Sequence, residues 1–447
     1  MGHMSDAAAI GGIGIGTMLF DLLYWNFGFL RVGTSGLTAQ AYGRWTKDNG
    51  QRTKDNGQGT KGMPETTKIL LQSLSISGIG ALFVWAIQWL FVTAALAIVP
   101  CSAEVAGVAR EYFFVRIWAA PATLSLMAFK GWFIGMQDTK SPMAVDILVN
   151  VVNMGASYGL AVYTPLGVVG VAWGTLIAQY SGLLLAAVLL KVRYSEVSLF
   201  RQQEEMKAAL RWSEMRRMMS LNGNLFVRSL CFMVVYVGYQ ALASQYGDTE
   251  LAVSIILMKL FMFFSYFVDG FAYAGEALVG KAFGERTKDN GQRTMDMGQR
   301  TMDKGQRTKD KGQWTKEIRD IVRLLFNWSI GVGLVFTGVY AIWGTECIGI
   351  MTDKPYVIDA AQNYLGWLTA MPIVSALAFM WDGVYIGATA GVQIRNAMIW
   401  AAAGFVVFYL ATYRIVGVQA LYVAYFAHLI ARVVYLSIKW DKLKVTS

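Results

Sequence analysis

Long apolar runs alternate with short polar segments along the whole chain, and this pattern predicts a series of hydrophobic helices. A helix of about 20 residues crosses the roughly 30 Å hydrocarbon core of a bilayer. Several runs exceed that length, which favours tilted or kinked helices. Eleven runs are long enough to span a membrane, and we expect them near residues 7–31, 69–99, 107–135, 143–163, 167–190, 219–243, 250–281, 320–344, 362–387, 396–413 and 418–438.

The composition also indicates a membrane protein. Of the 447 residues, 55% are hydrophobic and 15% are charged, whereas soluble domains carry roughly 25% charged residues. The 15 Trp and 21 Tyr suit membrane–water interfaces. The net charge of +10 lies in loops between apolar runs, so it does not indicate a nucleic-acid-binding protein. We therefore predict an all-α integral membrane protein with about 11 transmembrane helices.

Neither a metal site nor an enzyme active site is supported by the sequence. We find no nucleophile elbow, phosphate-binding loop or metal-binding motif. The cysteines are scattered and behave as small hydrophobic residues. The three cysteines are Cys101, Cys231 and Cys347. The chain has only two histidines, His3 and His428, which gives little support to a His-based metal or catalytic site.

The charges of the loops predict an orientation in the membrane. Loop 44–62 has five Lys and Arg against two acids, loop 191–217 has seven against four, and loop 285–317 has nine against six. The loops between them are short and neutral or acidic. Because basic loops stay in the cytoplasm, we expect the N-terminus outside and the C-terminus inside.

Two pairs of similar segments indicate a duplicated protein. Trp25–Arg44 resembles Ser265–Arg286 about 240 residues later, and Phe129–Lys140 resembles Trp381–Gln393 about 252 residues later. Paired halves in an apolar chain are typical of transporters built from internal repeats. We expect two repeat-related helix bundles. The expected parts are an N-terminal lobe (1–192), a cytoplasmic linker (193–217) and a C-terminal lobe (218–447).

A polar seven-residue unit, Trp/Arg-Thr-Lys-Asp-Asn-Gly-Gln, is repeated within segments 44–62 and 285–316. No position is apolar in every unit, which argues against a coiled coil, and we expect both inserts to be disordered. The linker 193–217 has apolar residues at loosely helical spacing, which predicts an amphipathic helix on the cytoplasmic surface.

Charged residues within the apolar runs are the candidate functional residues. Placing a charge in a membrane span costs about 2.5–3.5 kcal/mol on insertion scales, so such residues are candidates for function. Asp269 and Glu276 are seven residues apart and share a helix face, where either could hold a proton or a cation. The alternative is a structural ion pair, for example Asp269 with Arg228. The other candidates are Asp21, Asp146, Asp382, Arg228, Lys130, Lys259 and Arg432.

Asn224 and several aromatic residues are weaker candidates. Asn224 opens the first helix of the second half near Arg228, where hydrogen bonding between helices is the simpler role. Aromatic rings in a transport path could stack on flat cationic compounds, whereas packing or an interface belt is the alternative. The aromatic candidates are Tyr24, Trp25, Trp132 and Tyr273.

Three segments resemble the DinF-like branch of the multidrug and toxic compound extrusion (MATE) transporters. They are GFLRVGTSGLTAQAYG (28–43), FVDGFAYAGEALVG (267–280) and WDGVYIGAT (381–389). The resemblance covers the chain apart from the two inserts. It implies a V-shaped pair of six-helix lobes around a central cavity, and export of drug-like, often cationic, compounds in exchange for H⁺ or Na⁺. It also implies an acid at about the position of Asn224, where this chain has an amide.

The same resemblance implies a twelve-helix plan, of which this chain carries eleven helices. Aligning Gly43 with Gly284 places Met1 opposite about residue 242, so we expect the family's first helix, with its ion-coupling acid, to precede Met1. From this we expect little efflux by the chain as given. The alternatives to an antiporter are a flippase for lipid-linked precursors from the same superfamily and an inactive membrane remnant. We expect a monomer in the bacterial inner membrane, with small-molecule substrates and no cofactor besides the coupling ion.

Overall fold

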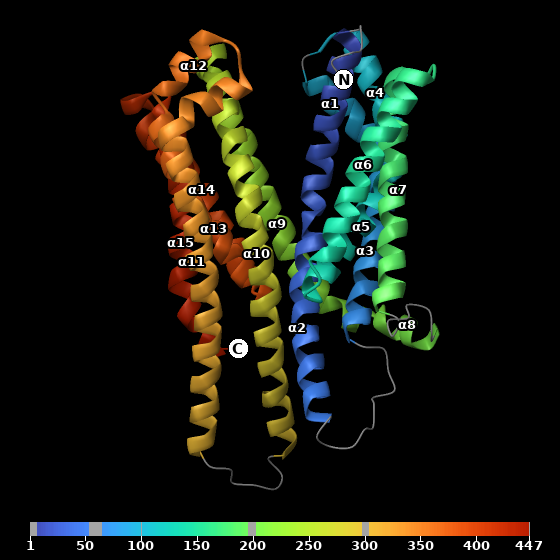
Figure 1. Ribbon diagram of the computed structural model, residues 1–447, viewed down its shortest axis with the longest axis vertical. Coiled ribbons are helices and arrows are strands. Elements are labelled where there is room, and N and C mark those ends of the chain that lie inside the picture. Colours follow the sequence, from blue (N-terminus) through green and yellow to red (C-terminus); the bar gives the residue numbers. More distant parts are fainter. Residues whose placement is uncertain (1–6, 53–64, 100, 195–202, 297–303, 447) are drawn as a thin grey trace. The chain divides into compact units, whose positions relative to one another are not determined.

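The protein is described by a computed structural model over residues 7–52, 65–99, 101–194, 203–296 and 304–446, and every regular element in these residues is a helix (Figure 1). The all-α prediction is therefore confirmed. Eleven of the described segments are long and apolar enough to cross a membrane, at positions that match the predicted runs. They are Gly11–Lys47, Glu65–Ile98, Ala103–Gly135, Lys140–Tyr163, Gly167–Arg193, Trp212–Tyr246, Asp248–Arg286, Lys316–Met351, Leu365–Gly387, Gly391–Val416 and Gln419–Asp441.

The described residues group into two compact units. The first unit holds those of Met1–Thr38 and Gln58–Ser220, and the second holds those of Ala39–Gly57 and Leu221–Ser447. The sequence predicts one lobe for residues 1–192, whereas the structure groups residues 39–52 with the second unit. The reason is a close backbone contact between this helix and a helix of the second half, described below.

The first unit is built from helices α1 to α8, with α2 continuing into the second unit. A short 3₁₀ segment (Asn26–Gly28) joins α1 to α2, and another (Ile117–Ala119) joins α4 to α5. The helices are α1 (Ala7–Trp25), α2 (Phe29–Arg52), α3 (Glu65–Ile98), α4 (Ala103–Arg116), α5 (Ala120–Gly135), α6 (Lys140–Tyr163), α7 (Gly167–Arg193) and α8 (Gln203–Ala209).

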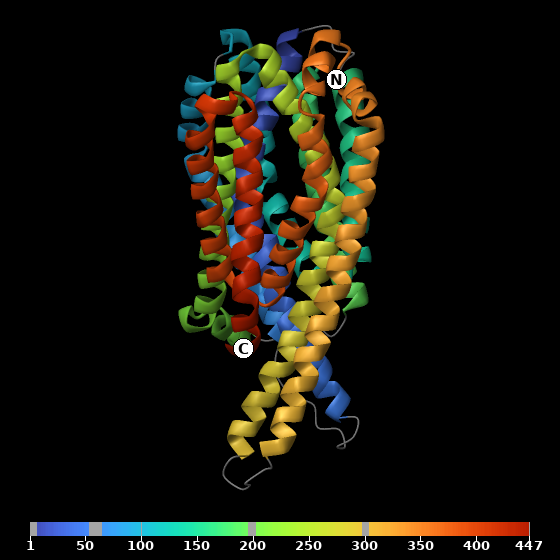
Figure 2. The ribbon, with the colours of Figure 1, turned by 90° about the vertical axis from the view of Figure 1, so that its left-hand side faces the viewer.

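The second unit contains α9 from Leu221 onward and helices α10 to α15. Figure 2 shows α10 and α11 running side by side, and the red pair α14 and α15 doing the same. Helix α11 contains a kink at Trp343, where the backbone leaves helical geometry. The helices are α9 (Trp212–Ala243), α10 (Asp248–Asp296), α11 (Lys304–Met351), α12 (Pro355–Gln362), α13 (Leu365–Gly387), α14 (Gly391–Val416) and α15 (Gln419–Thr446), with a 3₁₀ segment at Ser244–Tyr246.

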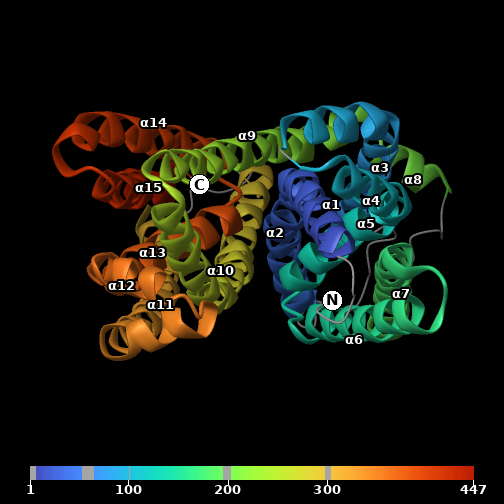
Figure 3. The ribbon, with the colours of Figure 1, turned by 90° about the horizontal axis from the view of Figure 1, so that it is seen from above.

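Helix α6 lies beside α7 in the first unit (Figure 3), and it exposes large apolar side chains. Its exposed large side chains recur three or four residues apart, so they form one stripe along the helix. A continuous exposed apolar stripe is unfavourable in water but is solvated well by lipid tails. This surface therefore fits a helix that faces the bilayer. The stripe consists of Met143, Ile147, Val151, Met154, Tyr158 and Val162.

The predicted internal repeat is present at the level of single hydrogen bonds. In the first unit, the Ser77 hydroxyl on α3 donates to the carbonyl oxygen of Leu124 on α5 at 3.1 Å. In the second unit, the Ser329 hydroxyl on α11 donates to the carbonyl oxygen of Ala376 on α13 at 3.3 Å. Both residues of the second bond lie 252 positions after those of the first. A second pair of bonds at this spacing joins Trp85 to Ile117 and Thr337 to Thr369.

The corners that follow α5 and α13 are also alike. Gln137 and Thr389, again 252 residues apart, are the described non-glycine residues with positive φ, at 64° and 53°. At each corner the next amide, of Asp138 or Ala390, donates to a carbonyl oxygen five residues earlier at 2.9 Å. This is the bonding of a helix end closed by a left-handed residue. The chain thus turns from α5 into α6 and from α13 into α14 in the same way.

Glycines bring α2 and α10 into backbone contact within the second unit. A methyl group added at Gly43 would overlap the carbonyl oxygen of Lys281, and one added at Gly284 would overlap that of Gln40. Gly284 and Lys281 each lie 241 residues after Gly43 and Gln40, so the contact is reciprocal. The two copies of the first repeat motif therefore pack against each other, which explains why this part of α2 belongs to the second unit.

Parts of the polar inserts are helical, which corrects the prediction that both are disordered. Helix α2 continues to Arg52, α10 continues to Asp296, and α11 begins at Lys304. Extending an existing helix adds one hydrogen bond per residue without a new nucleus, and Arg, Lys and Gln are good helix formers. Segments 53–64 and 297–303 lie outside the described residues, as does 195–202 of the linker. The linker's described part holds the seven-residue α8 and the start of α9 instead of one long amphipathic helix.

Candidate transport site

Close packing of α10 on α13 positions the candidate acids of the second unit. A methyl group at Gly383 would overlap the carbonyl oxygen of Ala272, and one at Gly387 would lie 2.8 Å from the amide nitrogen of Gly280. Such glycine contacts let two membrane helices approach at backbone distance. As a result, Asp382 on α13 and Glu276 on α10 are held on two helices that are packed together.

Asp382 lies between two arginines from other helices. Its Oδ2 atom accepts a hydrogen bond at 2.5 Å from Nη2 of Arg228 on α9 and another at 2.6 Å from Nη2 of Arg432 on α15. Asp382 and Arg432 are 5% and 1% exposed, so this ion pair is enclosed by protein. The Arg432 guanidinium also lies 5.7 Å from the centre of the Phe379 ring. The cluster joins α9, α13 and α15.

The sequence left two alternatives for Asp269, a transport role or a structural ion pair with Arg228. In the structure, Arg228 forms an ion pair with Asp382. Asp269 itself is half-buried on α10, and Glu276, two turns further along, is 1% exposed. Tyr273 on the same helix is half-buried. The transport roles of Asp269, Glu276 and Tyr273 remain predictions.

Asn224 takes part in a bond between helices. Its Oδ1 accepts a hydrogen bond at 3.0 Å from Nη1 of Arg395 on α14, and the same guanidinium donates to Oδ1 of Asn396. This is the simpler of the two roles that the sequence suggested for Asn224. Arg395 was not selected from the sequence, because it lies in the polar start of α14 and outside the predicted apolar run.

The candidates of the first unit have varied surroundings. Asp21 is exposed on α1, and Tyr24 and Trp25 at the end of that helix are half-buried. Trp132 is fully buried and donates from its indole nitrogen to the carbonyl oxygen of Thr66 at 2.8 Å. In this conformation the Trp132 ring is enclosed by protein, so its contacts are those of a packing residue, and stacking on substrates stays a prediction.

Lys130 occupies the place in the first unit that Asp382 occupies in the second, 252 residues later. It forms an ion pair with Asp146 on α6, whose side chain is about half exposed. The two repeats therefore carry opposite charges at the same point of the same scaffold. Lys259, the remaining charged candidate, is exposed on α10.

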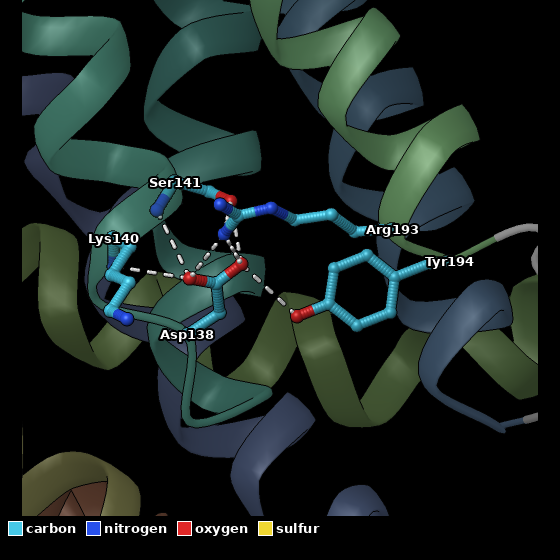
Figure 4. Close-up of polar contacts among 5 residues, drawn as sticks. All are labelled: Asp138, Lys140, Ser141, Arg193 and Tyr194. Carbon is cyan, nitrogen blue, oxygen red and sulfur yellow. Dashed lines mark hydrogen bonds and ion pairs between the residues drawn. The ribbon is translucent and has the colours of Figure 1, made fainter.

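A polar cluster at the corner between α5 and α6 was missed by the sequence analysis (Figure 4). The Asp138 carboxylate accepts hydrogen bonds at 3.0 Å from the amides of Lys140 and Ser141 and at 2.5 Å from the Ser141 hydroxyl. From the end of α7, Arg193 and the Tyr194 hydroxyl donate to it at 3.2 Å. Burial raises the pKa of Asp138, but the bonds from Ser141 and Arg193 outweigh it and hold this pKa below its ordinary value.

Asp138 caps the amino-terminal end of α6, and it also ties α6 to the last turn of α7. An Asp shortly before a helix start is a recognisable capping signal. The contacts with Arg193 and Tyr194, in contrast, depend on where α7 ends. In the described residues, no group of three or more His, Cys, Asp or Glu could hold a metal ion.

Comparison with known proteins agrees with this architecture. The MatE family model matches residues 57–159. The chain is 30% identical to the DNA damage-inducible protein F of Escherichia coli, over 99% of this chain and 86% of that protein. It is 22% identical to Protein DETOXIFICATION 43 of Arabidopsis thaliana, over 66% of this chain and 49% of that protein.

The fold is also that of a solved structure. A crystal structure of MATE in the bent conformation superposes with a TM-score of 0.80 at 15% identity, covering 99% of this chain and 89% of the other. Together with the family model and the near full-length bacterial relative, this confirms the resemblance that the sequence motifs indicated. The chain is thus a multi-pass membrane transporter, not an enzyme, and it belongs to the MATE family, in its DinF-like branch.

Proposed function

We propose that this transporter exports drug-like cationic compounds in exchange for H⁺ or Na⁺, and that the coupling acids lie on α10. The observation that carries the proposal is Glu276, a carboxylate that is 1% exposed within a membrane-spanning helix. Asp269 lies two turns away on the same helix. A carboxyl group in such a position binds a proton, Na⁺ or an organic cation in competition, which is what exchange requires.

Asp382 is less suited to coupling than the α10 acids. Two guanidinium groups already donate to its Oδ2, and their positive charges oppose the binding of a further cation there. Removing one partner of a buried ion pair leaves an uncompensated charge, at a cost of about 3–5 kcal/mol. We therefore assign Asp382 to holding α9, α13 and α15 together, and we assign exchange to Asp269 and Glu276.

The test uses the full chain in proteoliposomes, with a cationic dye such as ethidium and an imposed pH or Na⁺ gradient. Asp269→Asn and Glu276→Gln should each reduce gradient-driven dye movement at least about tenfold, since they remove the exchangeable charge. The control is Asp359→Asn, which neutralises an exposed acid on α12 outside the membrane-spanning segments and should keep wild-type transport.

Two further measurements distinguish a loss of ion coupling from a loss of folded protein. Reconstituted yield and unfolding temperature should match the wild type in both α10 variants. Whichever gradient drives dye movement in the wild type identifies the coupling ion. Wild-type rates in both α10 variants, or no gradient-driven movement in the wild-type protein, would contradict the proposal.

We further propose that the protein acts as a monomer in the bacterial inner membrane with its C-terminus in the cytoplasm. The basic loops support this orientation. The bacterial relative, which is covered over 86% of its length, supports the location. We propose no cofactor besides the coupling ion and no nucleic-acid partner.

A further inference from the structure

The cluster around Asp382 brings more positive than negative charge together. Two guanidinium nitrogens, from Arg228 and Arg432, lie 2.5 and 2.6 Å from a single carboxylate oxygen. One carboxylate therefore faces two permanently charged groups. Over these contacts of the described residues the cluster carries one net positive charge. Arg228 keeps 22% of its side chain exposed, but Arg432 and Asp382 are enclosed by protein, where a further anion would balance the charge favourably.

Each of these arginines also has a buried hydrogen-bond donor without a partner in the described residues. Among the described residues, buried Nε of Arg228 and buried Nη1 of Arg432 have no hydrogen-bond partner. Leaving a buried charged donor unpaired costs more than the 1–3 kcal/mol typical of a neutral group. His428, one turn before Arg432 on α15, is fully buried beside these arginine donors. These donors can be satisfied by a bound acceptor.

The repeated scaffold does not by itself call for the charges of Asp382 and Arg432. The first unit builds the same hydrogen bonds and corners, but it has Lys130 in the place of Asp382. The hairpin glycines Gly167 and Gly417 set the spacing between α7 and α15 at 250 residues, so Gly182 stands in the place of Arg432. Because the first unit packs α7 without an arginine at this place, the repeated scaffold does not explain Arg432, and its presence points to a ligand.

We propose that Arg228 and Arg432 form a binding site for a monovalent anionic group within the second unit. A single negative charge would balance the cluster, and the free Nε and Nη1 donors would hydrogen-bond to it. The anionic group would be a halide held by the guanidinium donors alone, or the carboxylate of an aromatic compound whose ring packs near Phe379, beside Arg432. The arginines of this site are residues other than the coupling acids proposed on α10.

The experiment measures binding of radiolabelled chloride to the purified full-length protein, with gluconate as the replacement anion at constant ionic strength. Chloride should bind saturably and raise the unfolding temperature, since a ligand that binds only the folded state stabilises it. Arg432→Gln should weaken chloride binding at least about tenfold. The control is Arg323→Gln, which removes the same charge from an exposed position on α11 and should bind like the wild type.

Arg228→Lys is a second variant, which keeps the positive charge. It tests the site even if Arg432→Gln does not fold. Lysine lacks the Nε donor, so weaker chloride binding is expected at an unchanged net charge. No saturable binding to the folded wild-type protein, or equal affinity in the arginine variants, would overturn the proposal and leave water as the occupant.

The two sources of the anionic group are distinguished with benzoate. If benzoate displaces chloride and is itself carried into proteoliposomes, the site receives a carboxylate of a transported compound. If chloride binds but benzoate neither displaces it nor moves, the site holds a resident halide. Both outcomes support an anion site, and failure of both anions to bind contradicts it whether or not the α10 variants lose dye export.

Discussion

At the scale of single residues, Asp138 makes the clearest contribution to stability. Asp138→Ala removes the cap of α6 and the partner of Arg193 and Tyr194. Losing a cap and its charged hydrogen bonds should lower the free energy of unfolding by about 1–3 kcal/mol. Thermal or denaturant unfolding of the purified protein measures this. The control is Asp359→Ala, at an exposed acid on α12 outside the membrane-spanning segments, which should cost no more than about 1 kcal/mol.

The same residue predicts a dependence of stability on pH. The pKa of Asp138 is lower in the folded protein than its ordinary value of 3.8. Its contribution is therefore complete above pH 3.8 and is lost as the pH falls through the folded-state pKa. The stability difference between wild type and Asp138→Asn should shrink with acidification in that range. A difference that stays constant down to complete protonation would show that charge plays no part.

The sequence identified single charged residues better than their partners. Asp382, Arg228 and Arg432 stood out because charges are rare in apolar runs. Their convergence on one oxygen could not be predicted, since it depends on how α9, α13 and α15 pack. Trp132 shows the converse case, because its aromatic ring suggested stacking while the helix contacts enclose it.

At the scale of helices, two glycines set the distance between packed elements. Gly131 of α5 leaves no room beside the carbonyl oxygen of Arg31, and Gly383 of α13 leaves none beside that of Ala272. Alanine at either glycine should destabilise its unit by about 1–3 kcal/mol, because a backbone carbonyl cannot rotate aside as a side chain can. Unfolding of each variant in detergent gives the value.

Glycines with open space beside them provide the matched controls. Gly155 and Gly331 have no atom within 4 Å of an added methyl group. Alanine there should be neutral or stabilising by up to about 1 kcal/mol, because alanine favours the helix. Equal effects at contact and control glycines would refute the packing argument.

The helices themselves were largely predictable, but their ends were not. Runs of apolar residues located all eleven spans, because length and hydropathy decide whether a helix can cross lipid. The first span was expected to end near residue 31, but α2 carries it to Lys47, where small and polar residues pack against other helices. The left-handed corners at Gln137 and Thr389 were also missed, because neither is a glycine.

At the scale of the whole molecule, the proposed orientation predicts which sites face the medium. Single cysteines at Asp248 and Asp353, introduced into a chain without its native cysteines, should react with a membrane-impermeant thiol reagent added to intact cells. Cysteines at Arg211 and Lys439 should react only after the membrane is opened, because basic segments remain inside. Labelling of Arg211→Cys in intact cells would reverse the orientation.

The duplication was visible in the sequence, whereas the boundary between the units was not. Matching motifs located the repeats because their spacing is preserved over whole helices. The border within α2, after Thr38, follows from the contact of Gly43 and Gly284 with opposite backbones. A contact between residues 241 positions apart leaves no local signal in either segment.

That reciprocal contact limits how the two copies of the duplicated segment can change. Gly43 leaves room for the backbone of the second copy, and Gly284 leaves room for the backbone of the first. A larger residue in either copy would push the other copy away and spoil both fits at once. The repeats differ in charge elsewhere, with Lys130 in the first and Asp382 in the second. At this contact, in contrast, a substitution in one copy disturbs the packing of both.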